Sequence, residues 1–94
     1  MAKERSTRRF SLGQVVITRN AHSALPVQEV RQALTRPSNA DWGEACEADW
    51  QLNNEALLND SRLLSVYSTS NGTRFWIITE WDRSVTTILL PQDY

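Results

Sequence analysis

The sequence predicts a single α+β domain, with helices packed on one face of a mostly antiparallel sheet. A β-branched stretch near the start is followed by helical patterns, and then by three strand-like stretches joined by short turns. This order is typical of an α+β sandwich rather than of alternating β–α units. The length of 94 residues suits one domain with a modest core.

The first predicted element is a strand over Gly13–Thr18, in the letters GQVVIT. Three of its residues, Val15, Val16 and Ile17, are β-branched and apolar in succession. An apolar run of this kind is typical of a strand that is covered on both faces. We therefore expect this strand at the centre of the sheet.

A short helical turn and a first helix are predicted next. Asn20 is the expected cap of the turn, because its side-chain oxygen can accept from the free backbone N–H groups of a helix start. Pro26 suits the first position of the helix that follows. The apolar stripe of this helix is expected at Val27, Val30 and Leu34.

A second, longer helix is predicted between Pro37 and Asp60. Pro37 disfavours helix at the residue before it, so it separates the two helices. Ser38, Asn39 or Asp41 is the expected cap, and the acidic residues in the first turns favour the helix dipole. The expected inner face consists of Trp42, Ala45, Cys46, Leu52, Ala56 and Leu57.

Three strands are predicted in the last third of the chain, over Arg62–Ser68, Thr73–Glu80 and Val85–Leu90. Asn71-Gly72 indicates a hairpin turn between the first two strands, and the letters WDRS indicate a second turn. Apolar residues alternate onto both faces of the middle strand, which indicates a central strand or one covered on both sides.

The charge of the chain is unevenly distributed. Residues 1–9 are mostly basic and are predicted to form a flexible arm before the domain at 10–94, whereas the remaining chain has six Arg against ten acidic residues. An acidic body argues against a dedicated DNA-reading domain. No apolar run has the roughly 20 residues needed to cross a membrane, no secretory signal is visible, and one cysteine allows no internal disulfide, so we expect a cytoplasmic protein.

From about Leu12 to Tyr94 the chain resembles a family of small proteins encoded on bacterial plasmids and genomic islands. The resemblance implies carriage by a mobile genetic element and no settled activity. Relatives often have Arg-His before the DWG letters, where this chain has Arg36-Pro37, so chemistry that depends on this His is in doubt. The stretches that carry the resemblance are LGQVV at 12–16, DWG at 41–43, Asp49, Asn53, Ala56-Leu57, RLLSVY at 62–67 and FWIITEWDRSVTTILLPQDY at 75–94.

The element order also resembles RelE and ParE toxins and the barnase-like and colicin-type ribonucleases, although a fold-level likeness cannot assign function. In a ribonuclease of this kind Glu80, Asp82 and Arg83 would be the catalytic residues, because RNA cleavage needs an acid or base and a cation beside the phosphate. Arg62, Arg74 and Tyr94 are expected nearby. The acidic body is a poor match for RNA binding, so a protein without enzymatic activity is favoured.

No metal or cofactor is expected. His22, Cys46, Glu47 and Asp49 have no recognised ligand spacing. The chain has three glycines and no Gly-rich phosphate loop. Trp42 and Trp76 are expected in the core.

The favoured hypothesis is a protein that binds a host or plasmid protein and inhibits a host defence complex, of the anti-CRISPR or anti-restriction type. Acidic residues of the second helix would mimic nucleic-acid phosphates in a nucleoprotein complex, and two exposed indoles would anchor the contact. Two alternatives stay open: a RelE-like ribonuclease or toxin, and a homodimer with a plasmid housekeeping role and Trp76 or Trp81 at its two-fold interface. The expected partner-binding residues are Asp41, Glu44, Glu47, Asp49, Trp50 and Trp81.

Overall fold

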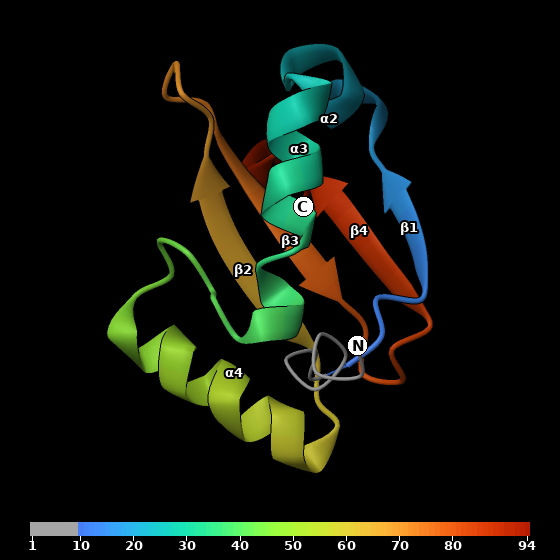
Figure 1. Ribbon diagram of the computed structural model, residues 1–94, viewed down its shortest axis with the longest axis vertical. Coiled ribbons are helices and arrows are strands. Elements are labelled where there is room, and N and C mark those ends of the chain that lie inside the picture. Colours follow the sequence, from blue (N-terminus) through green and yellow to red (C-terminus); the bar gives the residue numbers. More distant parts are fainter. Residues whose placement is uncertain (1–9) are drawn as a thin grey trace, which may run out of the picture.

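The computed structural model describes residues 10–94, and the predicted basic arm at 1–9 lies outside the described residues. The described part is one α+β domain with three α-helices and a four-stranded mixed sheet (Figure 1). The elements are β1 (Gln14–Ile17), α2 (Arg19–Ala24), α3 (Val27–Leu34), the 3-10 turn η1 (Pro37–Asn39), α4 (Glu47–Asn59), β2 (Leu63–Ser68), β3 (Arg74–Thr79), β4 (Val85–Leu89) and the 3-10 turn η2 (Pro91–Asp93).

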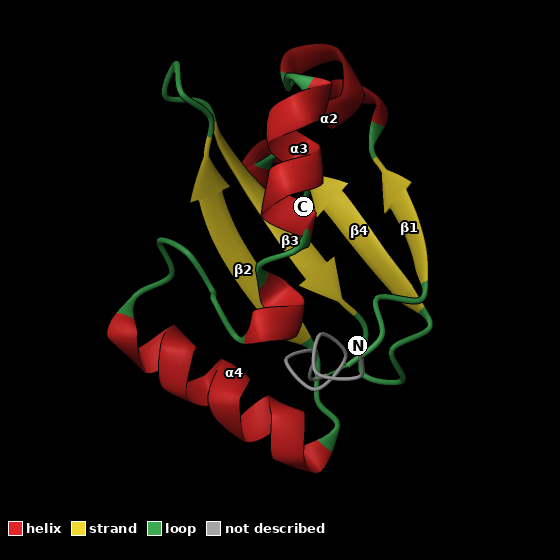
Figure 2. Ribbon diagram, in the orientation of Figure 1, coloured by secondary structure: helices red, strands yellow, loops and turns green. Residues whose placement is uncertain are grey.

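The strand order in the sheet is β1-β4-β3-β2 (Figure 2). The last three strands form an antiparallel meander, in which Val66 lies opposite Trp76 and Ile77 lies opposite Ile88. The two predicted turns are present: Gly72 turns the chain with a positive φ of 91°, and the Asp82 carboxylate accepts from the backbone N–H of Ser84. The prediction of a three-stranded meander is therefore confirmed.

β1 is an edge strand, so its predicted central position is wrong. It pairs parallel to β4 on one side, and no described strand lies on its other side. Val15, Val16 and Ile17 are 42%, 37% and 36% exposed. The β-branched run predicted extended structure correctly, but the central place in the sheet goes to β3 and β4, which bury larger side chains against the helices.

One face of the sheet is covered by α3, which crosses it in Figure 1, and α2 packs at the end of this face, beyond the arrowheads of β1 and β4. The side chains of alternate residues in the meander point to this face and are buried against the helices. Val27 of the predicted helical stripe is exposed, and Ala33 takes its place in the core. The main core consists of Ala21, Leu25, Val30, Ala33, Tyr67, Phe75, Ile77, Ile88 and Leu90.

A second, smaller core joins α4 to β2. Trp42 is fully buried there with Ala56 and Leu63. α4 lies along β2 at the border of the sheet, rather than over its centre with α3 (Figure 1). The helical layer is therefore uneven: α3 covers the centre of the face, α2 covers one end of it, and the longest helix covers one edge.

The start of α4 differs from the prediction. The segment before it is a 3-10 turn and an irregular loop, because Ala40 and Gly43 have positive φ angles of 60° and 68° that end any helix. The loop runs beside β2, where the N–H of Val66 donates to Trp42 O at 3.1 Å and the N–H of Glu44 donates to Val66 O at 2.6 Å.

The predicted inner face of α4 and the predicted first cap are also partly wrong. Leu52 is 60% exposed and Cys46 is exposed, whereas Asn53 is buried because its amide pairs with the backbone of β2. The cap of α2 is Thr18, whose hydroxyl accepts from the N–H of Ala21. A polar residue on the inner face is invisible to a search for apolar periodicity.

Candidate functional site

The sheet face opposite α2 and α3 carries an apolar hollow of about 250 Å³. Leu64, Trp76 and Ile78 form its floor, because they alternate with the core residues of β2 and β3. Arg62 and Tyr94 complete the lining at the rim. This face of the meander is thus hydrophobic like its opposite, but within residues 10–94 no α-helix covers it, and only the 3-10 turn η2 contacts β3 there (Figure 1).

An aromatic and a cationic side chain shape the rim of the hollow. The Tyr94 ring meets the Trp76 ring edge-on, with centroids 5.6 Å apart. The Arg62 guanidinium donates to the Tyr94 hydroxyl at 3.0 Å and lies 3.7 Å from a carboxylate oxygen of Glu80. Tyr94 is nevertheless 72% exposed, so one face of its ring is open to solvent.

Asp93 anchors η2 and Tyr94 through hydrogen bonds of its carboxylate. Its carboxylate accepts from the Thr18 hydroxyl at 2.6 Å, from the Asn20 amide at 2.7 Å and from the backbone N–H of Leu90 at 3.1 Å. The hydrogen bonds from Thr18 and Asn20 hold the pKa of the Asp93 carboxyl below its usual value. Asp93 therefore fixes η2 at the junction of β1 and α2, and this places Tyr94 over the sheet.

The composition of the hollow is typical of a surface that contacts another protein. Its floor contains no nucleophile, carboxylate or imidazole. Trp, Tyr and Arg are the side chains that most often dominate the energy of protein–protein contacts, since they combine a large apolar surface with a polar tip. A partner's apolar side chain can fill the floor while a polar group reaches Arg62.

The ribonuclease candidates Glu80, Asp82 and Arg83 all lie near the β3–β4 turn, but their side chains bind different groups and not one another. Arg83 donates to the backbone carbonyls of Ser61, Ala56 and Glu80 at 2.6–3.0 Å. Asp82 accepts from Ser84, and these hydrogen bonds lower the pKa of the Asp82 carboxyl. The guanidinium of Arg83 is thus directed at α4 and the segment after it.

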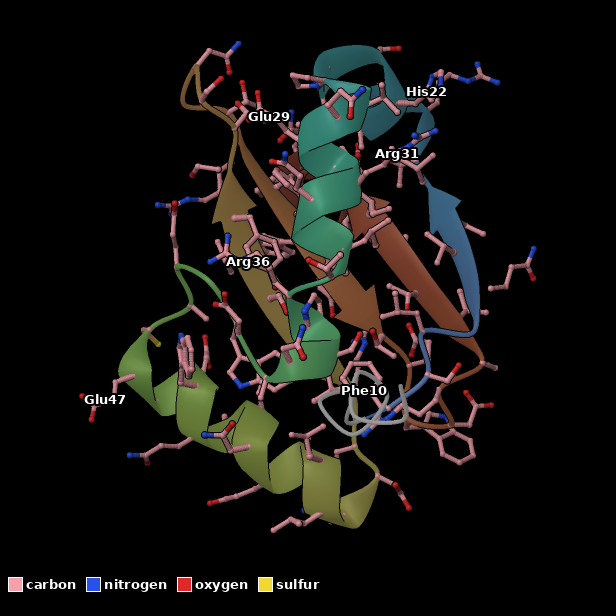
Figure 3. The ribbon with its side chains drawn as sticks, in the orientation of Figure 1. Phe10, His22, Glu29, Arg31, Arg36 and Glu47 are labelled. Atoms are coloured by element: carbon pink, nitrogen blue, oxygen red, sulfur yellow. The ribbon has the colours of Figure 1, made fainter. Side chains whose placement is uncertain are left out.

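Arg83 also has a positive φ of 60°. Its guanidinium lies 5.4 Å from the centre of the Phe10 ring. Figure 3 shows Phe10 beside this turn. The Ala56 carbonyl near the end of α4 also accepts from the backbone N–H groups of Asp60 and Ser61, so Arg83 adds a charged donor to the C-terminal end of that helix. Of the expected neighbours, Arg62 and Tyr94 lie beside Glu80, whereas Arg74 pairs with Glu44.

Arg83→Ala is expected to destabilise the domain by about 2 kcal/mol, because three carbonyls lose a charged donor. Thermal unfolding followed by circular dichroism should show a melting temperature about 10 °C lower. The matched control is Arg31→Ala, which removes an exposed arginine and should change little. A ribonuclease role predicts the opposite pattern, with intact stability and lost RNA cleavage.

The expected partner-binding residues come from three segments. Asp41 lies in the loop before α4, where the Arg36 guanidinium contacts it at 2.8 Å and lowers the pKa of its carboxyl. Glu44, in the same loop, binds Arg74 at 3.3 Å and the Ser68 hydroxyl at 2.9 Å. Two of the four carboxylates expected to mimic phosphates are therefore already paired with arginines.

The remaining four lie on α4 and at the β3–β4 turn. Glu47 and Asp49 are in the first turn of α4, and Figure 3 shows Glu47 directed away from the domain. Trp50 is half-buried, and its indole N–H donates to Gly43 O at 3.3 Å. Trp81 is 63% exposed. The structure thus gathers Glu47, Asp49 and Trp50 on one helix and leaves Trp81 on a separate turn.

The hollow is not among the sites predicted from the sequence. Alternation along β3 correctly indicated two apolar faces, but Trp76 was expected in the core, whereas this side chain is half-buried in the floor of the hollow. The signal that could have located the site is the second apolar face combined with a terminal tyrosine. Tyr94 lies 18 residues from Trp76 in the sequence, and only the turn at η2 brings them together.

Two other classes of site are absent from residues 10–94. This part of the chain holds no group of three His, Cys, Asp or Glu side chains that could bind a metal ion. None of its helices is long and apolar enough to cross a membrane. Comparison with family models, curated proteins and solved structures found no significant match to this chain.

Proposed function

We propose that this chain is a protein-binding module whose partner docks on the open face of the sheet. The observation that carries the proposal is the hollow between β2, β3 and Tyr94, with an apolar floor and an Arg–Tyr–Trp rim. Hot spots of protein interfaces have this composition, since a desolvated pocket surrounded by aromatic side chains excludes water from the contact.

The chemistry of the hollow also describes the partner. A volume of about 250 Å³ accommodates an aliphatic or aromatic side chain of the partner. The guanidinium of Arg62 lies 3.7 Å from the Glu80 carboxylate and is half-exposed. It can therefore donate hydrogen bonds to a carboxylate of a partner at a shorter distance. We therefore expect a partner segment with a large apolar residue and an acidic residue next to it.

A narrower hypothesis, inhibition of a nucleoprotein defence complex, concerns the opposite side of the molecule. It is supported by α4, which has acidic residues Glu47 and Asp49 in its first turn and no basic residue between Glu47 and Asn59. Carboxylates on such a helix can compete with nucleic-acid phosphates for a basic groove. This mechanism needs Glu47 and Asp49, whereas docking at the hollow needs Arg62 and Tyr94.

The test is affinity capture of partners from a bacterial host lysate, with the immobilised wild-type protein and single variants side by side. Tyr94→Ala is expected to weaken capture by about 30-fold, because it removes an exposed hot-spot aromatic, and Arg62→Ala should act in the same direction. The matched control is Trp81→Ala, which also removes an exposed aromatic but leaves the hollow intact.

The outcomes distinguish the two surfaces. Loss of the captured protein with Tyr94→Ala but not with Trp81→Ala supports the hollow. Loss with Glu47→Lys or Asp49→Lys alone supports the acidic helix instead. A wild-type protein that retains no partner under any condition contradicts both mechanisms.

A further inference from the structure

The outer edge of β1 is open. The backbone N–H of Gln14 donates to Ser84 O, in the turn before β4, at 2.9 Å, and the N–H of Thr18 donates to Ile88 O of β4 at 3.0 Å. In a parallel ladder alternate residues bond to one neighbour, so the N–H and C=O groups of Val15 and Ile17 point away from β4. No described element lies beyond β1 to pair with them (Figure 1).

The other edge of the sheet is closed. The Asn53 amide donates to Leu64 O at 2.6 Å and its oxygen accepts from the N–H of Leu64 at 3.1 Å. Two residues further along β2, the loop before α4 pairs with both backbone groups of Val66. The outward-facing backbone groups of Leu64 and Val66 in β2 are therefore occupied by the chain itself, whereas those of Val15 and Ile17 in β1 have no partner among the described residues.

Natural proteins protect an open edge with charges, proline or a bulge, because an apolar edge pairs with other strands. β1 has none of these: residues 14–18 contain no charged residue and no proline. Its three apolar residues are exposed although the rest of the sheet is well packed. The β1 edge is apolar and unprotected, whereas the β2 edge is covered by the chain. This difference indicates that another strand pairs with β1.

We propose that β1 pairs antiparallel with β1 of a second copy of this chain, forming a two-fold dimer with a continuous eight-stranded sheet. A two-fold axis beside Val16 puts Val16 opposite its counterpart and Val15 opposite Ile17 of the second copy. The backbone groups of Val15 and Ile17 then form the hydrogen-bonded pairs, as the outward direction of these groups requires.

A second copy fits this edge for two reasons. First, with no charge between 14 and 18, self-pairing brings no like charges together, and β-branched residues lie opposite one another, which favours strand pairing. Second, the closed β2 edge stops the sheet from growing further. An interface that pairs a surface with itself forms a closed dimer instead of a fibre.

This dimer is separate from the proposed docking surface. The hollow lies on β2 and β3, whereas the proposed interface lies on β1 at the opposite edge of the sheet. Each copy in the dimer would keep its own hollow, so the protein would present two docking sites. The dimer can form whether or not a partner binds the hollow.

The test measures mass in solution by sedimentation equilibrium, over protein concentrations from about 10 μM to about 1 mM. The wild-type protein is expected to reach twice the monomer mass of 10.8 kDa. Val16→Lys should leave a monomer, because two ammonium groups would face each other across the two-fold axis. Val16→Glu should do the same through two carboxylates.

A mixture of equal amounts of Val16→Lys and Val16→Glu is the decisive experiment. If residue 16 faces its counterpart, the two variants should form a mixed dimer, since opposite charges then meet across the axis. Misfolding of either variant would not produce this rescue. The matched control is Val27→Lys, which makes the same change at an exposed valine on α3 and should remain dimeric.

Three results would overturn the proposal. The first is a wild-type protein that remains monomeric over the whole concentration range. The second is a dimer whose mass Val16→Lys does not change. The third is a mixture of the Lys and Glu variants that stays monomeric.

Discussion

Gly43→Ala is expected to destabilise the domain by about 3 kcal/mol. Gly43 has a positive φ of 68°, which costs a residue with a Cβ about 1 kcal/mol. A Cβ at this position would also overlap the carbonyl oxygen of Val66 and the ring of Tyr67. Relief of such overpacking costs about 2 kcal/mol more, because the loop must move away from β2.

Thermal unfolding of Gly43→Ala should show a melting temperature about 15 °C below that of the wild-type protein. The matched control is Gly72→Ala in the β2–β3 turn. Gly72 also has a positive φ, of 91°, but a Cβ added there would meet no other part of the chain within 4 Å. An equal decrease for both variants would show that the close approach of the loop to β2 contributes nothing.

Asn53→Leu is expected to cost about 3 kcal/mol of stability. The replacement keeps the side chain similar in size but removes both hydrogen bonds to the backbone of Leu64, and Asn53 is only 5% exposed. Each unpaired backbone group costs about 1–3 kcal/mol. Urea unfolding measures the loss, and Gln51→Leu, at an exposed amide of the same helix, is the control that should change little.

Asn53→Leu is also expected to change how the protein associates. With the Leu64 backbone groups freed, the β2 edge is open on the Leu63 side of Val66, so a dimer joined through β1 can associate further through these groups. Sedimentation should then show species larger than a dimer that increase with concentration. If Asn53→Leu has wild-type stability and wild-type mass, the amide does not close this edge.

Local patterns in the sequence predicted the strands of the meander and the positions of both turns. Asn71-Gly72 and the Asp82–Ser84 pair are turn signals that act within a few residues, and the structure keeps both. Alternation along β3 correctly indicated apolar side chains on both faces. These features depend only on neighbours in the chain, so a single sequence is sufficient to predict them.

The errors concern residues whose roles depend on distant partners. Asn53 looks like an ordinary surface residue of a helix until β2 supplies the backbone groups that bury it. Arg83 looks like a catalytic or turn charge until α4 presents its last carbonyls. The sequence of the loop at Gly43 resembles the start of a helix, but the backbone of this loop forms hydrogen bonds with Val66 of β2 instead.

The sequence alone determined the α+β class, the order of strands and helices along the chain and the turn positions, because these follow from propensity and periodicity. Only the tertiary structure decided which strand lies at the edge, which sheet edge is closed and where the second apolar face is left open. Those outcomes depend on contacts between segments far apart in the chain, such as Tyr94 with Trp76 and Asn53 with Leu64. The hollow and the open edge of β1 exist only after these contacts have formed.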